Sequence, residues 1–211
     1  MNFRVLNKDP VYDFREGNKI TEGIDLSDVM LINRPSGNEI EWWIKQILTN
    51  HSTLRCIKFR MTAKAPRSVI MQIIRATKEN PQPEVESSRP DWTGKARSSD
   101  PYEEKLFSQD HTAWSFIEMA KQRLCNRTER MTRDFMELAV ETLKASKDPF
   151  LQAVGYCCHP VCWWYGGLCP ETRGCGKEPK LSDKVIGHYR LDNNIPLLSK
   201  KEEAEVAMER R

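Results

Sequence analysis

Residues 57–66 read IKFRMTAKAP, and this stretch decides the fold class. Its apolar residues alternate with polar ones, and a period of two is typical of a half-buried β-strand. Pro66 then suits the first turn of a helix. The apolar face of that helix would hold Val69, Ile70, Ile73 and Ile74, which follow at helical spacing. A strand that leads straight into a helix indicates a mixed α/β (α+β) protein.

Upstream of this stretch the sequence predicts another helix. Residues 34–37 form a turn, and Asn38 offers a helix N-cap. Apolar residues then recur at i, i+3, i+4, i+7 and i+8, which predicts an amphipathic helix with Ile40, Trp43, Ile44, Ile47 and Leu48 on its inner face. Residues 4–14 are interpreted as a strand and a turn, with Pro10 in the turn.

Downstream, residues 78–108 are polar and contain prolines at 81, 83, 90 and 101, so we expect a long active-site loop. A helix is predicted from about Thr112 and another from about Thr128, because apolar residues return at helical spacing. Residues 150–180 form a tail rich in Cys and Trp. The charged stretch 199–211 is expected to be a short helix or a frayed end.

Length and composition set the broad class of protein. The 211 residues suffice for one domain, placed at 1–211, and 39% hydrophobic with 30% charged residues is typical of a globular chain. A net charge of +3 argues against direct nucleic-acid binding through phosphate contacts. No apolar run is as long as a membrane span and no signal peptide is recognisable, so we expect no membrane contact and a cytoplasmic location.

Short segments with chemical character occur in a fixed order along the chain. KAP at 64–66 leads into a predicted helix that carries Gln72 and Arg75, and SSR follows at 87–89. RLCNR at 123–127, then Arg133, and finally CPE at 169–171 with CG at 175–176 come later. In this order the segments resemble the signature of the flavin-dependent thymidylate synthase (ThyX) family, namely K-A-P, Q-x-x-R-H-R, S-x-R, R-x-C-x-R-A-Q-W-E-I-R and C-P-E-G…C-G.

The resemblance implies an architecture and a reaction. Members of this family are homotetramers with a small antiparallel sheet flanked by helices, and their active sites lie at subunit interfaces. They use FAD to transfer a one-carbon unit from methylenetetrahydrofolate to C5 of dUMP, which gives dTMP, with NADPH as the reductant. For this chain we therefore expect a ThyX-like fold and that activity.

Individual residues take their expected roles from the matched positions. The nucleotide-binding positions correspond to Gln72, Arg75, Ser87, Arg89 and Arg123, with Ser88 adding a hydroxyl. The flavin-lining positions correspond to Ser36, Arg75, Glu84 or Glu86, Thr112, Glu118, Arg123 and Arg127. The candidate catalytic residues are Arg123, which matches the position that reads the base, and Ser87, because C5 chemistry often uses covalent attack at C6. No base is evident beside Ser87, which favours phosphate binding for it.

The arginines also suit the ligand on chemical grounds. A planar guanidinium binds phosphate and carbonyl oxygens through two parallel hydrogen bonds. The alternative for Arg89 is a solvated loop charge. Arg123, Arg127 and Arg130 are three or four residues apart and, if this segment is helical, share one face of the helix. Pairing with Asp134 and Glu137 is the alternative, and it is preferred for Arg130 and Arg133.

Several positions depart from the family pattern. R-H-R is Arg75-Ala76-Thr77 here, and Cys56 stands where the family has a flavin-facing histidine. Glu118 replaces an asparagine, and because a carboxylate accepts a hydrogen bond from an amino group, dCMP becomes an alternative substrate. Two alternative functions stay open: a hydroxymethylase acting on dUMP or dCMP, and a non-catalytic nucleotide-binding relative.

Other side chains with reactive groups have simpler interpretations. His111 could shuttle protons but is better explained as a residue at a helix entry. Cys56 is expected to be a small buried strand residue. The tail contains Cys157, Cys158, His159, Cys162, Cys169 and Cys175, enough groups for a zinc site. No clean C-x-x-C pair occurs there, so we expect no metal.

Overall fold

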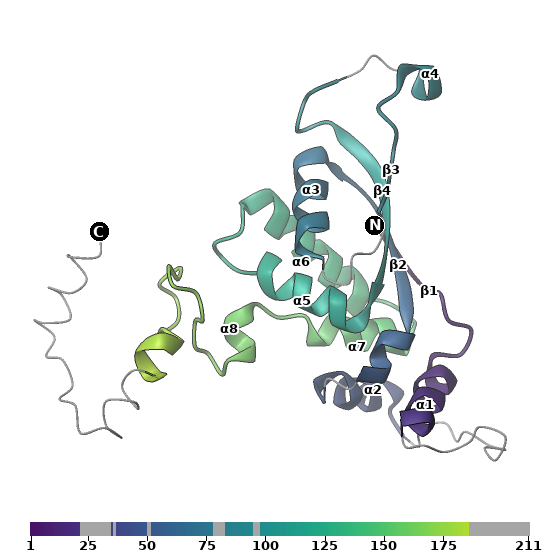
Figure 1. Ribbon diagram of the computed structural model, residues 1–211, viewed down its shortest axis with the longest axis vertical. Helices are drawn as coiled ribbons and strands as arrows, with labels where there is room; N and C mark the ends of the chain where they lie inside the picture. Colours follow the sequence, from purple (N-terminus) through teal and green to yellow (C-terminus); the bar gives the residue numbers. More distant parts are fainter. Residues whose placement is uncertain (22–34, 36, 50–51, 78–82, 95–97, 186–211) are drawn as a thin grey trace, which may run out of the picture. The chain divides into compact units, whose positions relative to one another are not determined.

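Figure 1 shows the computed structural model of the chain, coloured along the sequence. The structure describes residues 1–21, 35, 37–49, 52–77, 83–94 and 98–185. The chain contains two compact units, residues 1–160 and residues 161–211. Ser36 and the charged stretch 199–211 lie outside the described residues.

A four-stranded antiparallel sheet forms the centre of the first unit. In spatial order its strands are β1 (Asn2–Val5), β2 (Lys58–Pro66), β4 (Glu104–Thr112) and β3 (Glu84–Val85). β2 and β4 pair along their whole length, from Lys58 opposite Thr112 to Pro66 opposite Glu104. The strand predicted from the alternating pattern is confirmed as β2, and the mixed helix-and-strand class is confirmed as well.

The predicted long loop is wrong in part, because it contains regular structure. β3, the short helix α4 (Pro90–Thr93) and the first half of β4 all lie within residues 78–108. β4 escapes sequence analysis because its buried positions include Lys105, Gln109 and His111. Polar residues on the inner face of a strand remove the apolar alternation by which a strand is recognised.

Helices cover one face of the sheet (Figure 1). α3 (Arg67–Ala76) follows β2 directly after Pro66, and α5 (Ala113–Arg123) follows β4. α6 (Arg130–Lys144) is the longest helix among the described residues. All three agree with the helices predicted from periodicity. α5 begins where expected because the Thr112 side chain accepts from the Ser115 backbone N–H and the Ser115 side chain accepts from the Thr112 N–H, a capping box.

Three further helices belong to this unit, of which one was predicted and two were not. α2 (Glu39–Leu48) begins at its predicted cap, since Asn38 Oδ1 accepts from the backbone N–H of Ile40 at 3.0 Å. α1 (Pro10–Thr21) replaces the predicted turn, and α7 (Pro149–Cys157) begins the predicted tail. Both start with proline, which suits the first helical position because its missing N–H would have no partner there.

The core of the first unit is an aromatic cluster beneath the sheet. Trp43 of α2 packs edge-on against Phe150 of α7, with ring centroids 5.0 Å apart. Phe59 of β2 continues the cluster toward Phe116 of α5 at 5.5 Å. These four rings are fully buried, so α2, α5 and α7 are joined to the sheet through aromatic contacts.

In the second unit the described residues include the short helix α8 (Val161–Trp164) and an extended contact around Cys169. The Cys169 N–H donates to the Pro179 carbonyl at 2.7 Å, and the Leu181 N–H donates to the Cys169 carbonyl at 2.8 Å. Cys169 is buried at this bridge, which makes it a structural residue of the tail.

Gly155 of α7 lies against the last turn of α6 and gives a stability prediction. A Cβ at this position would lie 2.8 Å from the Lys144 backbone nitrogen and 2.9 Å from Leu143 Cβ. We expect Gly155→Ala to lower the free energy of unfolding by about 1–3 kcal/mol, because the helices must move apart. Urea denaturation measures this change. Glu137→Ala on exposed α6 surface is the control, and equal stability of the Gly155 variant and the wild type would contradict the prediction.

Candidate functional site

Arg123 and Gln72 meet where α5 ends against α3. Arg123 donates from Nε and Nη2 to the Gln72 backbone carbonyl, at 3.1 and 2.7 Å. In an α-helix the carbonyl of residue 72 points toward the N–H of residue 76. The guanidinium therefore lies beside the last turn of α3, which is the turn that carries Arg75. Residues 51 positions apart in sequence are thus brought into one place.

This junction carries unbalanced positive charge. Among the described residues, no carboxylate contacts Arg123 or Arg75, whereas Arg60, Arg89, Arg130 and Arg133 all have acidic partners. Partial burial lowers the pKa of Arg123 from its usual value, but a guanidinium remains protonated in proteins. A partly buried cation without a counter-ion favours an anionic ligand.

The residues that replace the family's His and Arg after Arg75 point into the protein. Ala76 is buried, and Thr77 is the C-cap of α3. The Thr77 hydroxyl donates to the Ile73 carbonyl at 2.8 Å and lies 3.4 Å from Gln109 Oε1 of β4. Neither residue therefore offers a charged or titratable group to a ligand at the junction.

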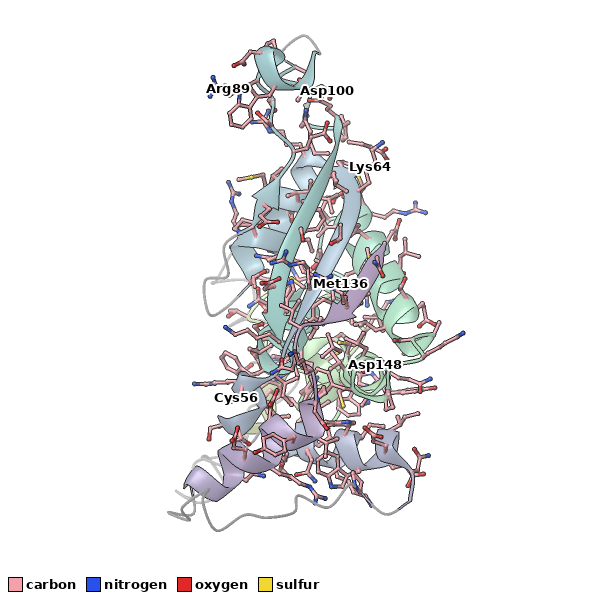
Figure 2. The ribbon with its side chains drawn as sticks, turned by 90° about the vertical axis from the view of Figure 1, so that its right-hand side faces the viewer. Cys56, Lys64, Arg89, Asp100, Met136 and Asp148 are labelled. Atoms are coloured by element: carbon pink, nitrogen blue, oxygen red, sulfur yellow. The ribbon has the colours of Figure 1, made fainter. Side chains whose placement is uncertain are left out.

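Ser87 and Arg89 belong to a turn that follows β3. Ser87 Oγ accepts from the Arg89 backbone N–H at 3.1 Å, and Arg89 pairs with Asp91 at 2.9 Å. Ser88 lies between them and is partly exposed. Figure 2 shows Arg89 at one end of the sheet and Cys56 at the other. Within one chain, the predicted phosphate-binding segment and the position of the flavin-facing histidine are therefore far apart.

The register of the sheet gives the scale of this separation. The Glu86 N–H donates to the Leu106 carbonyl, and Thr112 is six residues further along β4. Six residues of strand span roughly 20 Å. The predicted flavin residues Glu86 and Thr112 are thus not brought together in one chain. The expected location of the site between subunits remains a prediction.

Several predicted flavin residues already have structural partners. Glu86 accepts from the Leu106 N–H at 3.1 Å, and Glu84 lies 3.9 Å from Arg60. Glu118 forms an ion pair with Lys121 on α5. The Thr112 hydroxyl caps α5 and is buried. These contacts explain the residues without a ligand.

The predicted basic stripe on one helix face is wrong. α5 ends at Arg123 and α6 begins at Arg130, so the exposed Arg127 lies in the connection between two helices. The preferred structural roles of Arg130 and Arg133 agree with the structure: Arg130 lies 3.7 Å from Asp134 and Arg133 lies 3.7 Å from Glu137.

His111 is buried near the end of β4, one residue before the Thr112 cap of α5, which agrees with the preferred interpretation of a residue at a helix entry. Its ring centroid is 5.2 Å from that of Phe116 and 5.9 Å from that of Phe59, and neither ring nitrogen has a hydrogen-bond partner among the described residues. Burial lowers the pKa of His111 to about 3. The imidazole is therefore neutral at physiological pH.

The cysteines differ from the expectation in one respect. Cys56 is exposed and lies in the 3₁₀ helix η2 (Ser52–Cys56), so its predicted place in a buried strand is wrong. Cys157 is buried, which raises the pKa of its thiol to about 12. Burial also raises the pKa of Cys158. In the described part of the chain, no group of three His, Cys, Asp or Glu side chains is placed to hold a metal ion.

Asp91 and Trp92 were not predicted as part of any site, although both contact Arg89. The Arg89 guanidinium lies 4.7 Å from the Trp92 ring centroid, and it forms two hydrogen bonds with Asp91. The signal available in the sequence is the spacing R-P-D-W, which places an acid and an aromatic residue within three positions of the arginine.

No known protein family matches this chain, and no curated protein matches it either. Among the described helices, none combines the length and the apolar character needed to cross a lipid bilayer.

Proposed function

We propose that this protein binds a pyrimidine deoxynucleotide and transfers a one-carbon unit from methylenetetrahydrofolate to C5 of its base, with dUMP as the substrate. The observation that carries the proposal is the Arg123 guanidinium, which is fixed on the Gln72 carbonyl and has no acidic partner among the described residues. Gln72, Arg75 and Arg123 all match nucleotide-binding positions of the ThyX family. A fixed guanidinium can hold a uracil carbonyl or a phosphate oxygen without reorganising.

FAD is the proposed cofactor, and the residues present fit one part of it. Arg75 and Arg127 are exposed guanidiniums without acidic partners in the described chain, and they suit its diphosphate. When bound, the flavin supplies the electrons for reduction of the transferred carbon. NADPH, a homotetrameric assembly and a cytoplasmic location belong to the same proposal. The fit supports FAD binding through charge alone, because Glu86 and Thr112 have other partners.

The proposal is tested by the visible spectrum of the purified full-length protein after addition of FAD and gel filtration. Two results are expected. Flavin bands remain with the protein, and dUMP is converted to a product about 14 mass units heavier, which is the methylated nucleotide without an added oxygen. A product that carries one additional oxygen would indicate that the protein is a hydroxymethylase and not a methylating enzyme. The protein is then incubated with dUMP or dCMP, the folate donor and NADPH. If no modified nucleotide forms with either substrate, the proposed catalysis is wrong.

A specific observation favours the second candidate, a non-catalytic nucleotide-binding relative. Ala76 is buried, Thr77 caps α3, and His111 lies in the aromatic core. None of these residues therefore offers a general acid or base to the junction of α3 and α5. This candidate predicts that the protein binds dUMP, takes up no flavin and forms no product. The same sample therefore separates the two functions.

Arg123 gives the prediction that both candidates share. We expect Arg123→Gln to weaken dUMP binding roughly tenfold to a hundredfold, because charge-assisted hydrogen bonds contribute about 1.5–3 kcal/mol. Isothermal titration calorimetry measures the change. Arg130→Gln removes the same charge from an exposed arginine paired with Asp134 and should bind dUMP as the wild type does. Equal loss in both variants would mean that only overall charge matters.

A further inference from the structure

Residues 87–93 form a closed unit around Arg89. The backbone is fixed because the Arg89 carbonyl accepts from the N–H of Trp92 and the N–H of Thr93, both at 3.1 Å. The Thr93 hydroxyl donates to the same carbonyl at 3.0 Å. Arg89 therefore leaves a rigid turn at the end of the sheet, where Figure 2 shows it pointing away from the strands.

Asp91 occupies one edge of the Arg89 guanidinium. Arg89 Nε donates to Asp91 Oδ1 at 3.3 Å, and Nη2 donates to Oδ2 at 2.9 Å. Two parallel hydrogen bonds to two oxygens are also the geometry by which a guanidinium binds a phosphate group. The Asp91 carboxylate thus takes the place that two phosphate oxygens would use.

Trp92 holds the same guanidinium by a different contact. Arg89 Cζ lies 4.7 Å from the centroid of the indole ring, within the range of a cation–π interaction. The Trp92 residue as a whole is 71% exposed. Because this contact does not use the Nε–Nη2 edge, it can persist when that edge changes partner.

We propose that Asp91 is an internal competitor of the phosphate group at Arg89: a phosphate monoester displaces the Asp91 carboxylate, while Trp92 keeps the guanidinium in position. This inference rests on the proposed function, together with the sequence prediction that Ser87, Ser88 and Arg89 bind the phosphate of the nucleotide. It adds two residues outside the matched family positions, one that lowers affinity and one that positions the arginine.

The expected effect is modest because the ion pair is exposed. The Arg89 and Asp91 side chains are each 57% exposed, and exposed pairs of this kind are weak. We expect Asp91→Asn to tighten dUMP binding about twofold to fivefold, the range that such a weak competitor allows. Binding of deoxyuridine, which lacks the phosphate, should not change.

Calorimetric titration of dUMP into full-length variants tests the proposal. Glu104→Gln is the matched control, since it removes the same charge from an exposed residue near this end of the sheet whose ion pair is with Lys64. Asp91→Asn should gain affinity and Glu104→Gln should not. The gain should vanish in the Arg89→Gln background and shrink when Trp92→Ala is added. Unchanged or weaker dUMP binding by Asp91→Asn would overturn the proposal.

A second titration separates this proposal from the proposed function. Inorganic phosphate is added to wild type and to Asp91→Asn while the NMR signal of the Arg89 Nε–H group is followed. If the wild type fails to bind dUMP but phosphate shifts this signal at lower concentration in the variant, the competitor role stands and the nucleotide role falls. If phosphate shifts the signal equally in both proteins, or in neither, the competitor role is wrong.

Discussion

Lys105→Met is expected to lower the free energy of unfolding by about 2 kcal/mol, because it leaves the Glu103 carboxylate, whose side chain is only 23% exposed, without its lysine partner. Lys105 Nζ lies 2.7 Å from Glu103 Oε1, and the lysine side chain is only 5% exposed. Glu103 Oε2 is buried without a hydrogen-bond partner among the described residues. The pair therefore depends on the single contact that the substitution removes. Chemical denaturation measures the loss.

Matched variants distinguish the ion pair from lost packing. In the double variant Glu103→Gln/Lys105→Met no buried charge remains, so much of the stability should return. Lys64→Met removes a lysine whose side chain is 65% exposed and 3.9 Å from Glu104, and it should change stability by less than about 0.5 kcal/mol. A double variant no more stable than Lys105→Met would show that the charge is not the cause.

The second large effect is acid sensitivity caused by His111. The pKa of His111 is lowered to about 3 by burial, whereas the unfolded chain has a histidine pKa near the usual 6.5. Between these values the unfolded state binds a proton that the folded state does not. The contribution of His111 to stability is therefore complete well above pH 6.5 and falls as the pH decreases, by about 1.5 kcal/mol between pH 6.5 and 5.

Two other groups whose pKa is shifted bear on this window, Asp110 and His159. Asp110, the neighbouring charge, has its pKa lowered chiefly by its hydrogen bond with Arg60, so its contribution is lost only below the ordinary carboxylate range. His159 has a pKa lowered by partial burial and is less buried than His111.

Thermal or urea unfolding at several pH values provides the test. His111→Phe places an uncharged ring between Phe59 and Phe116 and should remove most of the slope between pH 6.5 and 5. His159→Gln should keep most of it. The readout is the slope, so it does not depend on how stable the variant is at neutral pH. An unchanged slope in His111→Phe would contradict the account.

The central part of the fold is predictable because local pattern and tertiary environment agree there. β2 alternates apolar and polar residues, and the helix after it shows its buried face at helical spacing. Asn38 and Thr112 cap their helices through backbone groups two or three residues away, so the starts of both helices can be recognised from the sequence. Where a residue's role depends only on its neighbours in the chain, the prediction succeeds.

β4 and the first helix show where such prediction fails. The inner face of β4 holds Lys105, which pairs with Glu103, and His111, whose ring packs against Phe116. Such contacts depend on tertiary structure and cannot be read from the strand alone. Pro10 is equally compatible with a turn and with the first residue of a helix, and packing of α1 decides between them.

The sequence names candidate residues for the site, but it does not give the contacts that these residues make. The resemblance singles out Gln72, Arg75 and Arg123, yet nothing in the sequence indicates that Arg123 bonds to the Gln72 backbone rather than to its side chain. The prediction that the arginines from 123 to 130 share one helix face is wrong because residues 124–129 connect two separate helices. Asp91 is missed because it acts through Arg89.

The most direct test of the central claim is a crystal structure of the full-length protein with dUMP. The account predicts the nucleotide within hydrogen-bonding distance of the Arg123 guanidinium at the junction of α3 and α5, with Arg123 still donating to the Gln72 carbonyl. A nucleotide bound elsewhere, or a carboxylate of a neighbouring subunit paired with Arg123 in its place, would contradict it.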